Sequence, residues 1–139
     1  MNILFAASEA VPFAASGGLA DVIGSLPKAI KADGHDCRIV IPLYKAIKPE
    51  LRAKLKFITN ITVDVSWRKQ YCGIFSAKLD GVTYYFIDNE YYFSRDGLYG
   101  FYDDCERFVF FDRAVLEMLK YIDFTPDIIN CNDWQTALV

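Results

Sequence analysis

The N-terminal third of the chain combines two continuous apolar runs with one stretch of helical spacing. Residues 2–7 (Asn-Ile-Leu-Phe-Ala-Ala) form a run typical of a parallel strand that is covered on both faces. Within residues 19–30, apolar side chains recur every three or four positions and predict an amphipathic helix, which Pro27 should kink or divide. Gly34 supplies a stop for this helix, and residues 37–42 form the second apolar run. This order predicts a right-handed βαβ unit.

The middle of the chain predicts antiparallel structure. Asp80 and Gly81 separate two segments rich in β-branched and aromatic residues, and Asp-Gly in such a position is a strong hairpin signal. We therefore expect a hairpin that leaves the main sheet and then rejoins it. The segments concerned are residues 55–65, 69–79 and 82–88.

The last third returns to a helix and a strand. Residues 89–104 are aromatic and lack a clear period, which suits an ordered surface loop. Residues 105–121 predict a long amphipathic helix, because apolar side chains fall at positions 108, 109, 111, 115, 116 and 119. Residues 127–131 then form another short run that predicts a buried strand.

Together these elements predict an α/β fold with a Rossmann-like, mostly parallel sheet and an antiparallel β-hairpin excursion. At 139 residues and 15.9 kDa, the chain has the size of one domain. The helix expected after Asp133 is barely two turns long, and a sheet of three or four parallel strands leaves apolar faces uncovered. We therefore expect the chain to be the first part of something larger, able to self-associate through the uncovered sheet.

Composition and charge exclude several classes of function. Hydrophobic residues make up 53% of the chain, enough for a buried core, and a net charge of −3 argues against binding to nucleic acid. No apolar stretch approaches the roughly 20 residues of a membrane-spanning helix, and the N-terminus lacks the basic start of a signal peptide. We expect a cytoplasmic protein. The four dispersed cysteines predict free, mostly buried thiols and no metal site.

The loop before the first helix is the first candidate site. Ser16, Gly17 and Gly18 join the first strand to the N-terminus of that helix, a position that favours phosphate groups. A plain tight turn explains the two glycines equally well. Asp21 lies in the first turn of the helix, where its carboxylate either serves a ligand or stabilises the helix dipole.

A second candidate site follows the last strand. Asn132, Asp133 and Trp134 lie where open α/β sheets bind ligands, beyond the carboxyl end of a strand. A carboxylate there can hold sugar hydroxyls, and an indole face can stack on a sugar ring. The alternative is structural, with Asn132 or Asp133 capping a helix and Trp134 in the core. The aromatic residues between positions 84 and 111 are expected mainly in the core, and His35 in a surface turn.

These motifs resemble the opening of bacterial glycogen synthases and plant starch synthases. The resemblance runs from end to end of the chain, and the combination of motifs is more specific than any one of them. It is carried by residues 2–13, 17–22, 24–27 and 34–36, and later by residues 127–129, 132–134 and 136–138.

The resemblance implies two Rossmann-like domains around a cleft and transfer of glucose from ADP-glucose to the non-reducing end of an α-1,4-glucan, with retention of configuration. Residues 1–139 would form a partial N-terminal domain, with the C-terminal donor-binding domain absent, and neither a metal nor a cofactor is implied. The implied catalytic residues, which line the cleft, are Asp21 and Asp133. The implied substrate-binding residues are Ser16, Gly17 and Gly18 on the donor side, Tyr99 on the acceptor side, and Trp134.

Two departures from the family pattern stand out. The family's loop usually reads Lys-Thr-Gly-Gly-Leu, whereas Ala15 stands in place of the lysine; Asn130 occupies a position that is often histidine. The family's catalytic histidine would lie past Val139. We therefore expect the chain to be inactive alone. The alternative is a non-catalytic, truncated or degenerate synthase domain that binds glucan or pairs with a partner.

Overall fold

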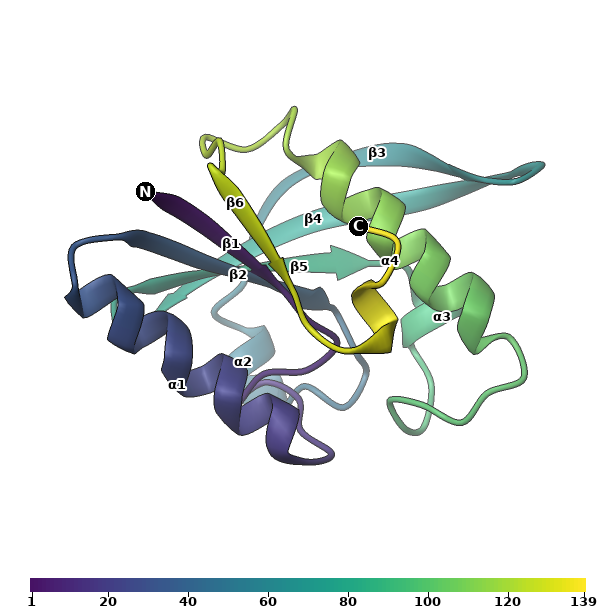
Figure 1. The fold of residues 1–139 in the computed structure, drawn as a ribbon. Coiled ribbons are helices and arrows are strands. Elements are labelled where there is room, and N and C mark those ends of the chain that lie inside the picture. The colour runs from purple at the N-terminus through teal and green to yellow at the C-terminus, as the bar shows by residue number, and fades with distance from the viewer.

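Six strands form a single mixed sheet in the computed structural model, which describes residues 1–139 (Figure 1). The strand order is β3-β4-β5-β2-β1-β6. The predicted α/β class and its mostly parallel core with an antiparallel excursion are confirmed. The elements are β1 (Asn2–Ala6), α1 (Gly18–Ala32), β2 (Asp36–Pro42), α2 (Pro49–Arg52), β3 (Lys56–Val65), β4 (Arg68–Leu79), β5 (Val82–Asp88), α3 (Glu90–Phe93), α4 (Asp104–Met118), β6 (Ile128–Cys131) and the 3-10 helix η1 (Trp134–Thr136).

Strand β1 is the centre of the parallel part of the sheet. It pairs in parallel with β2 on one side and with β6 on the other, so that Leu4 lies opposite both Arg38 and Ile129. Strand β2 pairs in parallel with β5, which confirms that the excursion rejoins the main sheet. Leu4 is fully buried and Phe5 nearly so, as the continuous apolar run predicted.

Helix α1 is continuous through Pro27, so the expected division of this helix is wrong. Proline removes one backbone donor from the helix, but Pro27 and Ile23 are both buried, and packing outweighs the lost hydrogen bond. Gly24 lies on the same buried side, where an added Cβ would come within 2.2 Å of Val11 Cγ2. At the other end, Gly34 adopts a φ of 93° and ends the helix as predicted.

The hairpin between β4 and β5 is confirmed at Asp80 and Gly81. Both residues have positive φ, 49° and 78°, as a two-residue turn between twisted antiparallel strands requires. Strands β3 and β4 are joined by a second tight turn at Ser66 and Trp67, which the sequence pattern did not mark. The two hairpins together form the antiparallel half of the sheet.

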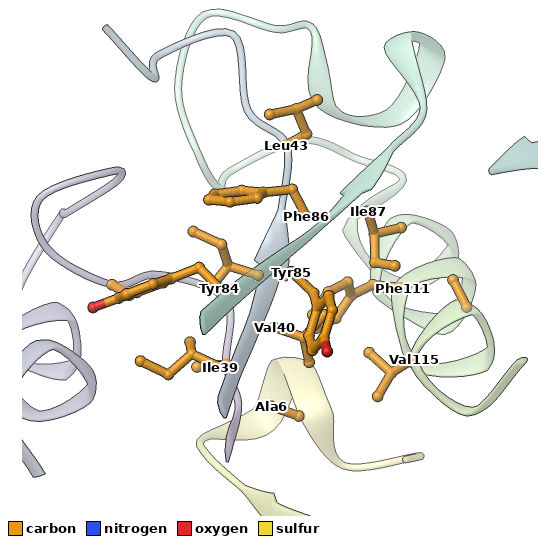
Figure 2. Packing of buried hydrophobic residues seen from close by; sticks show 14 of the residues in the cluster. Ala6, Ile39, Val40, Leu43, Tyr84, Tyr85, Phe86, Ile87, Phe111 and Val115 are labelled. Carbon is orange, nitrogen blue, oxygen red and sulfur yellow. The ribbon is translucent and has the colours of Figure 1, made fainter. Parts of the chain in front are cut away.

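Helices cover both faces of the sheet, and Figure 2 shows how the strand side chains divide between them. Tyr84, Phe86 and Ile39 point to the side of α1, where the ring of Phe13 lies 4.9 Å from the rings of both Tyr84 and Phe86. Tyr85, Ile87 and Val40 point to the other side, toward Phe111 and Val115 of α4. The predicted core role of the aromatic residues is confirmed for most of them.

Two segments differ from their predicted environment. The segment 89–104 is more than a surface loop, because it contains α3, and Tyr92 and Phe93 of this helix are fully buried. Asn89 starts the helix by accepting a hydrogen bond from the Tyr92 N–H at 3.0 Å. Strand β6 was expected to be buried, but Ile128 is 44% exposed, because β6 is the last strand of the sheet and has no neighbour on its outer side.

All four cysteines are free, as predicted, but only half of them are buried. Cys37 and Cys72 lie in the core, whereas Cys105 and Cys131 are exposed. Cys131 belongs to the same uncovered strand as Ile128, so its exposure has the same cause.

Helix α4 buries two charged side chains that its apolar pattern did not predict. Arg107 is fully buried and donates hydrogen bonds to the carbonyl oxygens of Tyr92 and Leu98 at 2.7 and 3.0 Å. Asp112 accepts one hydrogen bond, from the N–H of Leu138 at 3.1 Å, and its Oδ1 has no partner. Burial raises the pKa of Asp112 to about 7.

We predict that Asp112 makes stability depend on pH. Since its pKa is higher in the folded than in the unfolded chain, the folded state holds the extra proton between about pH 4 and 7. The free energy of unfolding should therefore fall as pH rises through this window and level off above it. Asp112→Asn stays neutral and still offers an oxygen to Leu138, so its Tm relative to wild type should rise by about 3 °C or more between pH 5 and pH 8.

Thermal melts followed by circular dichroism measure this difference. Asp33→Asn is the matched control, because Asp33 is exposed and its side chain makes no hydrogen bond. Equal pH dependence of the Asp112→Asn variant and the wild type would contradict the prediction.

Candidate functional site

The carboxyl ends of β1 and β6 lie side by side, because the two strands pair in parallel and Ala6 is opposite Cys131. The chain after β6 is fastened to β1 at this point. The backbone N–H of Asn132 donates to the carbonyl oxygen of Ala6 at 3.1 Å, and its side-chain Nδ2 donates to the same oxygen at 3.2 Å. The loop that follows β1 and the segment that follows β6 therefore start from one edge of the sheet (Figure 1).

The glycine loop is exposed and open on its outer side. A Cβ added to Gly17 or Gly18 would meet no atom within 4 Å. Gly17 has a φ of −168°, which is extended backbone that any residue adopts, and Gly18 begins α1. Neither the backbone conformation nor the packing of this chain requires a glycine at these two positions. A steric need for glycine therefore does not explain the pair, and the exposed backbone without side chains at the start of α1 would allow an anionic ligand to approach closely.

The side chain of Glu9 holds this loop by hydrogen bonds to Ser16. Glu9 was not identified as a site residue from the sequence. Glu9 is only 4% exposed. The carboxylate accepts hydrogen bonds from the backbone N–H of Ser16 and, at 3.0 Å, from the hydroxyl of Ser16. It also accepts one from the hydroxyl of Tyr99 at 3.2 Å. Glu9 lies three residues after the end of the buried strand β1, at the ligand-binding edge of a parallel sheet, and this position was the available signal.

Tyr99 connects the loop after β1 with the segment after β6. Its hydroxyl lies 2.7 Å from the hydroxyl of Ser8, and its ring lies 6.3 Å from the indole of Trp134. Burial raises the pKa of Tyr99, and the carboxylates of Glu9 and Asp133 add to this effect. The phenol therefore stays protonated at neutral pH.

Trp134 is half exposed rather than a core residue. One side of its indole packs against Phe108 of α4, with ring centroids 5.3 Å apart, and 53% of the side chain is exposed. An apolar cavity of about 280 Å³ lies between α4 and η1 beside this indole. An exposed aromatic face of this kind can stack on a sugar ring.

Asp133 caps η1, as one of the sequence alternatives predicted. Its Oδ1 accepts a hydrogen bond from the N–H of Trp134 at 2.7 Å. The backbone of Asp133 has φ 67° and ψ 179°, a region that glycine occupies readily and other residues rarely. Such a conformation destabilises the folded state locally when the residue is not glycine. The carboxylate of Asp133 is exposed at the edge of the sheet.

The structure brings some of the predicted site residues together and leaves others apart. Ser16 and Tyr99 share the carboxylate of Glu9, and Tyr99 contacts Trp134. Asp21 is exposed in the first turn of α1, and its carboxylate makes no hydrogen bond with any other site residue. No group of three His, Cys, Asp or Glu side chains could hold a metal ion, and no helix has the length and apolar character that crossing a bilayer requires.

Comparisons with known proteins point to one family. The family model described as "Starch synthase catalytic domain" matches residues 2–139. Over all 139 residues the chain is 60% identical to a glycogen synthase of Clostridium botulinum and 56% identical to one of Geobacillus stearothermophilus. The solved catalytic domain of starch synthase IV from Arabidopsis thaliana, bound to ADP and acarbose, is 33% identical and superposes with a TM-score of 0.87 over 99% of the chain.

The chain is much shorter than these relatives. It spans 29% of the length of each of the two glycogen synthases and 29% of the starch synthase chain. The similarity therefore covers the whole of this chain but less than a third of the length of these relatives.

We predict that the backbone of Asp133 favours glycine over alanine. Ala and Gly both remove the cap, but only Gly adopts φ 67° and ψ 179° without strain. Asp133→Gly should therefore be more stable than Asp133→Ala by about 1 kcal/mol or more, measured by urea unfolding. The same pair of substitutions at exposed Asp123, which lacks a positive φ, should show the opposite order. An alanine variant at least as stable as the glycine variant at position 133 would refute this account.

Proposed function

Because the chain belongs to the starch synthase catalytic domain family, we propose that it is the N-terminal part of a glycogen or starch synthase. The proposed reaction transfers glucose from ADP-glucose to the non-reducing end of an α-1,4-glucan with retention of configuration. The observation that carries the proposal is the end-to-end match to glycogen synthases. ADP and acarbose, bound in the related starch synthase, support a nucleotide donor and an oligosaccharide acceptor.

On the donor side we assign the glycine loop. Gly17 and Gly18 would approach the diphosphate or the glucose, and the open space beside them supports this role. Transfer creates an oxocarbenium-like sugar and a departing diphosphate, so backbone donors at a helix N-terminus would stabilise the leaving group. Ser16 lies one residue before the glycines and would hold the loop in place through Glu9.

On the sugar side we assign two carboxylates and two aromatic residues. Asp133 and Asp21 would orient sugar hydroxyls as the catalytic carboxylates of this half of the cleft, and the exposure of both supports direct contact with substrate. Trp134 would stack on a sugar ring, and Tyr99 would lie on the acceptor side. Residues 1–139 would form part of the N-terminal domain of a two-domain enzyme.

A second candidate is a non-catalytic domain that binds glucan or pairs with a partner. Two observations favour it. Ala15 brings no cation to the donor loop, and β6 is an edge strand with exposed apolar side chains such as Ile128. Self-association through this uncovered side of the sheet is part of the same proposal.

We predict that a chimera carrying residues 1–139 in place of the matching part of the Clostridium botulinum glycogen synthase transfers glucose from ADP-glucose to glycogen. The 139-residue chain alone should show no transfer. In the chimera, Asp133→Asn should lower kcat/KM by about 100-fold or more, because it removes a charge from the cleft. Radiolabelled glucose incorporation measures the rate, with the unaltered clostridial enzyme as the control. A folded chimera that binds glycogen without transferring glucose would favour the non-catalytic candidate.

We predict that Ala15→Lys strengthens donor use in the same chimera. A lysine near the diphosphate adds a charge-assisted interaction of about 1.5–3 kcal/mol, or roughly a 10- to 100-fold gain in kcat/KM for ADP-glucose. The KM for glycogen should stay unchanged. Ala53→Lys is the control, because Ala53 is exposed at the end of α2. If neither donor parameter changes, Ser16, Gly17 and Gly18 act only as a turn.

A further inference from the structure

The burial of the Glu9 carboxylate is unusual because no cation accompanies it. A carboxylate that loses water must be stabilised by hydrogen bonds or by an opposite charge. No lysine or arginine forms an ion pair with Glu9, and every donor it has comes from Ser16 and Tyr99. These partners are 7 and 90 residues away in the sequence. One carboxylate therefore joins the loop between β1 and α1 to the segment between α3 and α4, and neither of these segments belongs to the sheet.

Each of the two segments carries residues that face the proposed substrates. Ser16 directly precedes Gly17 and the N-terminus of α1. Tyr99 packs against Trp134, whose indole is half exposed. Because Ser16 gives both its N–H and its hydroxyl proton to Glu9, neither donor is left for a ligand, and the hydroxyl oxygen keeps only the capacity to accept.

We propose that Glu9 is a positioning residue that fixes the glycine loop and Tyr99 relative to one another, so that the donor and acceptor sides of the site move as one unit. Its importance for glucosyl transfer rests on the proposed function. The physical link between the two segments does not depend on the proposed function. It can be measured in the chain without substrate.

The chemistry of the link makes Glu9→Gln a sharp probe. A carboxylate offers two oxygens as acceptors: one accepts from the Ser16 N–H, which can only donate, and the other accepts from the hydroxyls of Ser16 and Tyr99, which donate here but can also accept. Glutamine has the same shape but no charge, so the charge-assisted hydrogen bond from the Ser16 N–H becomes a weaker neutral one, and its NH₂ group finds partners only if the hydroxyls of Ser16 and Tyr99 turn to accept. The side chain still fits, while its hold on Ser16 weakens and the Tyr99 hydroxyl keeps only its contact with Ser8. The wild-type carboxylate also raises the pKa of Tyr99, in agreement with its contact with the phenol.

The experiment is amide hydrogen exchange on the 139-residue chain, followed by NMR at Ser16. Glu9→Gln should speed exchange of the Ser16 amide at least tenfold, whereas amides of β1 and β2 should keep their wild-type rates and report an intact fold. Glu50→Gln, an exposed glutamate without side-chain hydrogen bonds, is the matched control. If Glu9→Gln does not fold, Glu9→Asp is the alternative, because it keeps the charge but is one methylene too short to reach both partners. It should show the same faster exchange of the Ser16 amide.

The link to Tyr99 is tested by a second substitution. Tyr99→Phe should speed Ser16 exchange about threefold in the wild-type background and leave it unchanged in the Glu9→Gln background. Equal effects in both backgrounds, or an unchanged Ser16 amide in Glu9→Gln, would overturn the proposal. In the chimera, Glu9→Gln should lower kcat at least tenfold with both KM values within about twofold. An inactive wild-type chimera would count against the proposed function only, because the exchange measurements stand without it.

Discussion

The fold depends on the parallel pairing of β1 with a neighbour on each side. Because β1 pairs with both β2 and β6, its backbone donors and acceptors are satisfied within the sheet, and its side chains are buried between helices on both faces. The same pairing brings the chain after β1 and the chain after β6 to one edge. Residues more than 120 positions apart, such as Ala6 and Asn132, are joined there by hydrogen bonds. The candidate site exists at this edge because the central strand ends there.

Much of the fold could be predicted from the sequence because local signals and tertiary packing agree. The Asp80-Gly81 turn and the glycine stop at Gly34 act through backbone preferences that the structure retains, and the apolar run at residues 2–7 acts through burial on both faces of the sheet. Pro27 shows where such reasoning fails. A preference of a few kcal/mol against proline in a helix was overruled by burial of the same residue.

The candidate site could be predicted only in part, because sequence patterns reveal exposed motifs better than buried networks. The glycines at the start of α1 and the Asp133-Trp134 pair lie beside predicted elements, so position alone marked them. Glu9 also follows a predicted strand, but its role depends on Tyr99, which is 90 residues away along the chain, so its position did not reveal what it binds. Arg107 and Asp112 were missed for a similar reason: they lie in α4 among apolar residues, and only the packed structure shows that they are buried.

The loop between β1 and α1 is surface-exposed at its tip, yet it is closed by three separate cross-links. Ala10 and Ala14 form an isolated β-bridge, the N–H of Val11 donates to the carbonyl oxygen of Ala20 at 3.1 Å, and Glu9 holds Ser16. Surface loops ordinarily accept insertions and deletions with little loss of stability. This loop cannot accommodate an insertion in the same way, because one added residue would separate the partners of at least one of the three cross-links. Its length should therefore be as constrained as that of a core strand, even though its outer residues face water.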